Sequence, residues 1–153
     1  MSRVDIKKTS PLSYAAMSAL ERYMKQTSIP PKYKEIVKIR ASIINGCAYC
    51  IDMHTHDAQK LGESERRIYA IAAWHESPLF TDEERALLEF TDEVTKISEH
   101  GVSDEVYKKI SAHFSELQIA EIIMQIITIN AWNRIAVSTQ MIYDPDKDNR
   151  GKE

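Results

Sequence analysis

Residues 35–54 read EIVKIRASIINGCAYCIDMH, and this stretch decides how the surrounding chain folds. Its first half carries isoleucines and a valine at helical spacing, which predicts a helix over 32–44. Asn45 and Gly46 tolerate left-handed backbone angles and are expected to end that helix. A second helix is expected over about 47–61. The stretch therefore predicts a helix–turn–helix that carries both cysteines of the chain at the start of its second helix.

Helical signals continue on both sides of this stretch. Pro11 is suited to the first turn of a helix, and capping boxes at 81–84 and 115–118 predict helices that run to about Glu99 and Met141. Shorter helices are expected over 64–74 and 103–113. No segment shows sustained alternation of apolar and polar residues, so the fold class is predicted to be all-α. We expect an N-terminal extension (1–9), one compact multi-helix domain (10–142) and a charged, disordered tail (143–153).

Composition excludes several classes of protein. The chain has 153 residues, of which 43% are apolar and 28% charged, and this balance is typical of a globular protein. The net charge of -3 and the interspersed charges give no basic face for nucleic acid. No apolar run is long enough for a membrane span or a signal peptide. A cytoplasmic location is therefore expected.

The two cysteines, Cys47 and Cys50, are the first sign of chemistry. Such a pair in a reducing compartment is more often catalytic or metal-binding than structural. A helix N-terminus stabilises a thiolate, and two cysteines three residues apart can form a disulfide. His54 lies four residues after Cys50 on the same helical face and could act as the base. The turn could also fold Glu35 back toward His54.

The sequence also allows other roles for these residues. The cysteines could be inert core residues, or Cys47, Cys50 and His54 could bind zinc together with His56 or Asp57. Glu35 could be a surface carboxylate, because Lys32, Lys34 and Lys38 surround it. Tyr49 could line a peroxide pocket or simply pack. A capping or pairing role, rather than a catalytic one, is expected of the polar residues Asn130, Asn133 and Arg134.

The stretch from Glu35 to His54 resembles the signature of the carboxymuconolactone decarboxylase superfamily, in its alkylhydroperoxidase D-like (AhpD-like), single-domain branch. The glutamate, both cysteines and the histidine fall at the family spacing. Residues 73–80 and 129–134 also resemble members of this branch, so the resemblance covers about residues 10–142.

This resemblance implies an all-helical fold that assembles into trimers, hexamers or similar rings. It also implies an alkylhydroperoxidase in which Cys50 attacks the peroxide, Cys47 resolves, and Glu35 and His54 relay protons. No bound cofactor or metal is implied, and the reductant would be an external dithiol such as a lipoyl group on a partner protein. Peroxidase members can carry a histidine where this chain has Tyr49, so their relay and donor do not transfer unchanged. Lactone decarboxylation is disfavoured, because decarboxylase members lack the cysteine pair.

The last predicted helix is apolar over more than half its circumference, with isoleucines at 119, 122, 123, 126, 127 and 129. Such a helix must be covered on several sides, and association into a homo-oligomer is a natural way to do so. The expected function is thus a thiol-dependent alkyl hydroperoxide reductase. The alternatives are a redox-sensing or interaction protein without significant turnover, and a zinc-binding module.

Overall fold

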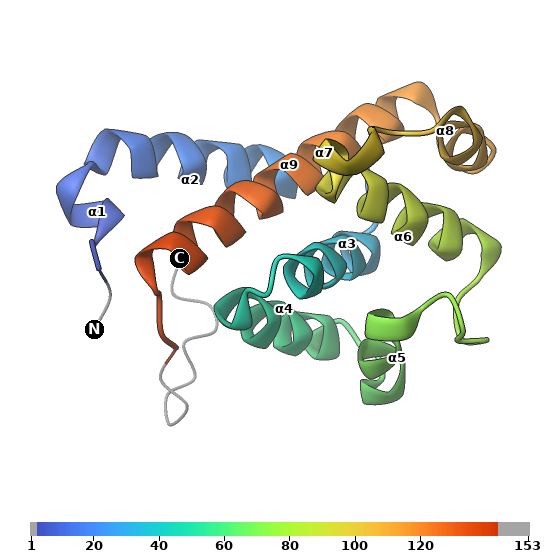
Figure 1. Cartoon of the computed structure of the whole chain (residues 1–153), viewed down its shortest axis with the longest axis horizontal. Coiled ribbons are helices and arrows are strands. Elements are labelled where there is room, and N and C mark those ends of the chain that lie inside the picture. Colours follow the sequence, from blue (N-terminus) through green and yellow to red (C-terminus); the bar gives the residue numbers. More distant parts are fainter. Residues whose placement is uncertain (1–2, 144–153) are drawn as a thin grey trace.

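The computed structural model describes residues 3–143, and all regular secondary structure within them is helical, as predicted (Figure 1). The predicted tail lies outside the described residues, apart from Tyr143. The described residues form nine α-helices and one 3-10 helix, and no strand: α1 Ile6–Thr9, α2 Pro11–Lys25, α3 Pro31–Ile44, α4 Ala48–Lys60, α5 Glu65–Ala70, η1 Ile71–Ala73, α6 Asp82–Thr95, α7 Ile97–His100, α8 Asp104–Ser111 and α9 Glu116–Thr139.

The sequence predicted most helix starts correctly, because side-chain caps mark them. Thr81 and Ser115 both form complete capping boxes at the starts of α6 and α9. Three details differ from the prediction. The helix expected over 64–74 is α-helical only to Ala70 and continues as the 3-10 helix η1. The expected extension contains one helical turn, α1, which Asp5 caps through the Lys8 N–H. The helix expected to run to Glu99 is divided at Lys96, whose ψ of 32° leaves the helical region.

Helix α3 is at the centre of the molecule and contributes to two apolar clusters. The first joins α3 to α6, α8 and α9 through the side chains Val37, Leu87, Phe90, Ile110, Ile122 and Ile126. The second joins α3 to α4, α5, η1 and α6 through Ile36, Ile39, Ala58, Ile68, Ile71, Trp74 and Leu88. Since α3 is packed on both sides, its orientation is fixed, and the turn that follows it is held in place.

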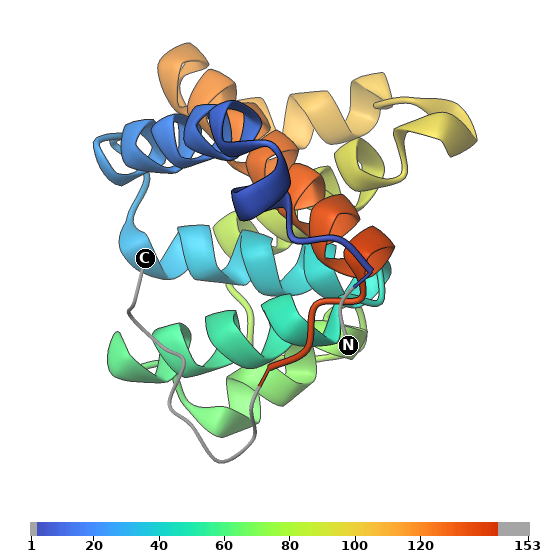
Figure 2. The ribbon, with the colours of Figure 1, turned by 90° about the vertical axis from the view of Figure 1, so that its left-hand side faces the viewer.

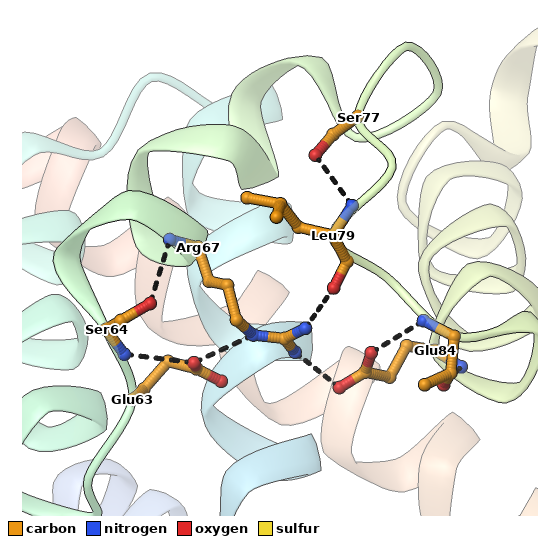
Figure 3. A network of polar contacts seen from close by, with 7 residues as sticks. Glu63, Ser64, Arg67, Ser77, Leu79 and Glu84 are labelled. Atoms are coloured by element: carbon orange, nitrogen blue, oxygen red, sulfur yellow. Dashed lines mark hydrogen bonds and ion pairs between the residues drawn. The ribbon is translucent and has the colours of Figure 1, made fainter.

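Two arginines, Arg40 buried and Arg67 half-buried, connect the elements around α6. Arg40 on α3 forms a bidentate ion pair with Asp92 on α6 (2.5 and 2.8 Å), and Trp74 donates to the same carboxylate. Arg67 on α5 contacts Glu63, Glu84 and the Leu79 carbonyl (Figure 3). We call these two sets of contacts the ionic clamp. The clamp joins α3 and α5 to the two ends of α6 through charged hydrogen bonds.

Helix α9 is the longest element and crosses the others, with α2 along one side of it (Figures 1 and 2). Several of its apolar side chains are buried, but Ile127 and Val137 are about half exposed. None of the described helices is both long enough and apolar enough to cross a membrane.

Candidate functional site

The turn between α3 and α4 brings the two cysteines together. Gly46 reverses the chain with a φ of +65°, in the left-handed region that glycine enters without strain. The Cys47 N–H donates to the Ser42 carbonyl (2.9 Å), which satisfies a free carbonyl near the end of α3. Figure 2 shows α3 and α4 side by side, with this turn near the C-terminal end of α9. The predicted helix–turn–helix is confirmed.

Cys47 and Cys50 are free and deeply buried, with 1% and 2% of their surfaces exposed. Their Sγ atoms lie 2.6 Å apart, and a hydrogen bond joins the two thiols. Cys47 is the N-cap of α4, and its sulfur accepts the Cys50 backbone N–H at 3.4 Å. The sulfur thus stands where a serine or aspartate oxygen caps other helices.

These donors change the acidity of Cys47. The hydrogen bond with the Cys50 thiol has the largest effect on the pKa of Cys47 and lowers it. Burial opposes this effect, and the Cys50 N–H, the Asn133 side chain and the Tyr49 N–H support it. Together they lower that pKa to about 7. A thiol with this acidity is substantially ionised near neutral pH, and the thiolate is the nucleophilic form.

Glu35 and His54 form a buried pair between α3 and α4. The Glu35 Oε2 atom lies 2.9 Å from His54 Nδ1, and each residue is only 7% exposed. Lys38, one turn further along α3, donates to the other carboxylate oxygen, also at 2.9 Å. The contact anticipated between Glu35 and His54 is present, and the alternative of a surface Glu35 is wrong. The sequence did not lead us to include Lys38 in the site. Its position three residues after Glu35, which places the two side chains on the same face of a helix, was the available signal.

The charge on Glu35 fixes how the imidazole is oriented. Burial raises the pKa of Glu35, but the hydrogen bonds and charges of His54 and Lys38 outweigh it and hold that pKa below its ordinary value. An ionised carboxylate only accepts hydrogen bonds, so His54 Nδ1 carries the hydrogen. In the neutral form of this tautomer, Nε2 is the nitrogen that accepts a hydrogen bond or a proton. The imidazole lies one helical turn after Cys50.

Uncharged polar side chains from α3 and α9 lie behind Cys47. We call Ser42, Asn45, Asn130 and Asn133 the amide cluster. Asn133 donates to the Ser42 hydroxyl (3.0 Å) and accepts from Asn45 (2.9 Å), and it also hydrogen-bonds the Cys47 sulfur. The sequence placed Asn130 and Asn133 in a pairing role only. The position of Asn133 beside the cysteine depends on how α9 crosses α3, which the sequence does not reveal.

Tyr49 packs, half-buried, against the small apolar cluster around Cys47 and Cys50. It does not line the surface recess of about 460 Å³ that lies beside Trp74, His75, Arg85 and Lys109. A pocket role for Tyr49 stays a prediction.

The ligand set expected for zinc is not the group that the structure brings together. In the described part of the chain, the potential ligand atoms of Glu35, His54 and Asp57 lie within 4.8 Å of one another, without either cysteine. The Lys38 ammonium already pairs with Glu35, so a cation is present at this carboxylate. The arrangement fits a proton-handling group better than a metal centre.

Comparison with known proteins agrees with this geometry. Residues 11–93 match the model of the carboxymuconolactone decarboxylase family. The chain belongs to this family. It is 43% identical over 136 residues to the uncharacterized protein YdfG of Bacillus subtilis, a match that covers 89% of this chain and 92% of that protein.

Solved structures show which branch of the family the chain resembles. A protein of unknown function from Agrobacterium tumefaciens, described as a candidate AhpD antioxidant defence protein, is 41% identical with a TM-score of 0.93 and covers 95% of this chain and 100% of its own. An AhpD-core, peroxidase-related protein from Ralstonia eutropha has a TM-score of 0.80 at 19% identity, over 92% of this chain and 75% of its own. The second match concerns the fold alone. The chain described here therefore has the AhpD-like fold.

Proposed function

We propose that this protein is a thiol-dependent alkyl hydroperoxide reductase that cycles Cys47 and Cys50 between dithiol and disulfide. The observation that carries the proposal is the pair of facing thiols at the start of α4, with their sulfurs 2.6 Å apart and an ionisable cysteine in the pair. The Glu35–His54 pair lies one turn away and supplies the base. Burial of both cysteines favours a small substrate and protects the sulfenic acid from further oxidation.

The reaction balances with these groups and an external dithiol. The Cys50 sulfur attacks the terminal peroxide oxygen, the O–O bond breaks, and the departing alkoxide takes a proton from the relay to leave as an alcohol. The Cys47 thiolate then displaces hydroxide from the Cys50 sulfenic acid, which leaves a disulfide and, after protonation, water. Two thiols of an external donor, such as a lipoyl group, reduce the disulfide by exchange and are themselves oxidised.

His54 and Glu35 have separate tasks in this scheme. The neutral imidazole accepts a proton at Nε2 and returns it to the leaving oxygen. Glu35 holds the ring in the tautomer with hydrogen on Nδ1 and stabilises the imidazolium that forms. Lys38 keeps the carboxylate ionised and oriented through its hydrogen bond.

The proposal is tested by peroxide-dependent turnover with a dithiol reductant. Cys50→Ser is expected to lose turnover by about three orders of magnitude, because its hydroxyl is a much weaker nucleophile. Cys47→Ser is expected to accumulate Cys50 sulfinic acid, which intact-mass spectrometry detects. Wild-type-like turnover in Cys50→Ser would overturn the proposal, and a Cys47→Ser enzyme that cycles without overoxidation would remove the resolving role.

A second candidate function is a redox switch of assembly, and the exposed apolar side chains of α9 favour it. Ile127 and Val137 are 46% and 49% exposed on a helix whose other faces are buried. We propose a homo-oligomer that covers them. Light scattering on reduced and oxidised protein separates the two functions: a change of molecular mass with redox state and no turnover favours the switch, and a constant mass with turnover favours the enzyme.

A further inference from the structure

The proposed cycle requires protons to reach a buried part of the molecule. Two hydrogens leave the external dithiol as protons, and they end in the alcohol and the water, which both form at the cysteine sulfurs. Cys47 and Cys50 are only 1% and 2% exposed, and Glu35 and His54 are each 7% exposed. The pair that serves these sulfurs therefore has little contact with solvent of its own, and it needs a neighbouring group that exchanges protons with water.

Asp57 lies at the edge of this buried pair. It follows His54 by three residues on α4, so the two side chains share a face of the helix. A carboxylate oxygen of Asp57, a ring nitrogen of His54 and a carboxylate oxygen of Glu35 all lie within 4.8 Å of one another. The Asp57 side chain is 38% exposed. Of the three groups, it is the one that reaches from solvent to the buried pair.

The separation of these groups suits proton transfer through a single water molecule. A hydrogen bond joins heavy atoms about 2.7–3 Å apart, so one water can bridge polar atoms separated by up to 4.8 Å. Carboxylates and imidazoles both accept and release protons, which is what each member of a relay has to do. The arrangement therefore provides a short path from solvent through Asp57 to the His54 ring.

The two lysines beside these carboxylates cannot take over this task. Lys38 donates to Glu35 at 2.9 Å and is 14% exposed, but an ammonium group has no lone pair with which to accept a proton. Lys60 lies 3.8 Å from Asp57, and because the Lys60 side chain is 50% exposed, this ion pair is weak. Asp57 is therefore not committed to Lys60.

We propose that Asp57 is the proton port of the site, the group that passes protons between solvent and the Glu35–His54 pair. The inference rests on the proposed function and deepens it, since it assigns the route by which the relay is resupplied. In each transfer, a proton moves from solvent to the Asp57 carboxylate and then, through one water, to the imidazole. The reverse path releases it. No electron moves in these steps, and no further reactant is needed.

Peroxide turnover in the presence of acetate tests the port. Asp57→Ala removes the carboxylate and leaves both cysteines and the Glu35–His54 pair in place. It is expected to lower turnover by about tenfold or more, because proton transfer to the relay becomes slow. Acetate, added in place of chloride at equal ionic strength, is expected to restore most of the lost rate, since it supplies the missing carboxylate. Wild type should not respond to acetate.

Two further variants separate proton transfer from a structural role. Asp57→Glu keeps the carboxylate and is expected to retain most of the turnover. Asp52→Ala removes an exposed carboxylate from the same helix and should neither lose turnover nor respond to acetate. Far-ultraviolet circular dichroism compares the folding of the variants. A structural role for Asp57 would give a loss in Asp57→Ala that acetate does not restore, and this result would overturn the proposal.

A measurement without peroxide separates this inference from the proposed function. Nuclear magnetic resonance of protein with isotope-labelled histidine measures how fast the His54 ring hydrogen exchanges with water, and His54→Gln identifies its signal. Exchange is expected to be slower in Asp57→Ala than in wild type by about tenfold or more. Slower exchange in a protein without peroxidase activity would reject the proposed function and keep the proton port.

Two other results would overturn the proton port. One is equal exchange of the His54 ring hydrogen in Asp57→Ala and wild type. The other is zinc that stays bound to wild type after dialysis but not to Asp57→Ala, because the three groups would then be metal ligands.

Discussion

The ionic clamp and the amide cluster both connect buried polar groups between helices, but they do so in opposite ways. In the clamp, Arg40 and Asp92 meet as full charges in a bidentate pair, and Arg67 joins two glutamates. In the cluster behind Cys47, a hydroxyl and three amides connect α3 to α9 without a net charge.

The difference has a chemical reason. Removing one partner of a buried ion pair leaves an uncompensated charge, so such a pair locks a structure. A cationic side chain against Cys47 would keep it a thiolate to lower pH, whereas the neutral groups around it lower the pKa of Cys47 only to about 7. The site can therefore change its charge during a reaction, and the clamp cannot. Four predictions test this contrast, from the largest expected effect to the smallest.

Asp92→Ala is expected to destabilise the protein by about 3–5 kcal/mol, because it leaves the Arg40 guanidinium buried without a counter-charge. The free energy of unfolding from urea denaturation checks this. Asp52→Ala, at an exposed position of α4, is the matched control and should stay within about 0.5 kcal/mol of wild type. A loss below 1 kcal/mol in Asp92→Ala would mean that the clamp does not lock the fold.

Glu35→Gln is expected to reduce peroxide turnover by about 100-fold, with the fold retained. A glutamine oxygen can still accept from His54, but it cannot stabilise the imidazolium, and Lys38 loses its counter-charge. Steady-state kinetics measure the loss, and Glu105→Gln on the surface of α8 controls for the change in net charge. Full turnover in Glu35→Gln would show that the buried carboxylate is structural, like those of the clamp.

The stability of the reduced protein is expected to rise with pH between about 7 and 9. The pKa of Cys47 is lower in the folded than in the unfolded chain, so its contribution is complete above the unfolded pKa and disappears as pH falls through about 7. The rise should be on the order of 1–2 kcal/mol relative to Cys47→Ser. Parallel stability curves for the two proteins would contradict an ionisable Cys47.

Thr81→Ala should cost about 1 kcal/mol, the usual worth of an N-cap. Thr81 accepts the Glu84 N–H, and Glu84 returns a bond to the Thr81 N–H while also pairing with Arg67. Thermal denaturation measures the loss, and turnover should be unchanged. A drop in turnover would show that the clamp and the site are coupled.

Much of the fold could be predicted because its signals are local. The caps at Thr81 and Ser115, the break at Gly46 and the spacing from Glu35 to His54 all act within a few residues or across one turn. The division at Lys96 has no comparable signal in the sequence.

The rest of the site depends on contacts between distant segments. Asn133 reaches Ser42 across 91 positions, and nothing in either segment specifies which face of α9 meets α3. The role of Lys38 was not predicted for a different reason. The three lysines near Glu35 suggested a solvent-exposed surface, but the aliphatic part of a lysine can be buried while its ammonium pairs with a carboxylate.

Because Cys47 is the N-cap of α4, the reduction potential of a Cys47–Cys50 disulfide would depend in part on the stability of the start of this helix. The sulfur is a strong acceptor for the Cys50 N–H only as a thiolate, so oxidation weakens this cap as well as the bond from Asn133. Interactions that favour the reduced state make a disulfide a stronger oxidant, by about 30 mV for each tenfold change in the equilibrium constant. In the proposed dithiol cycle, the first turn of α4 would therefore help to set the range of donors that can reduce the protein.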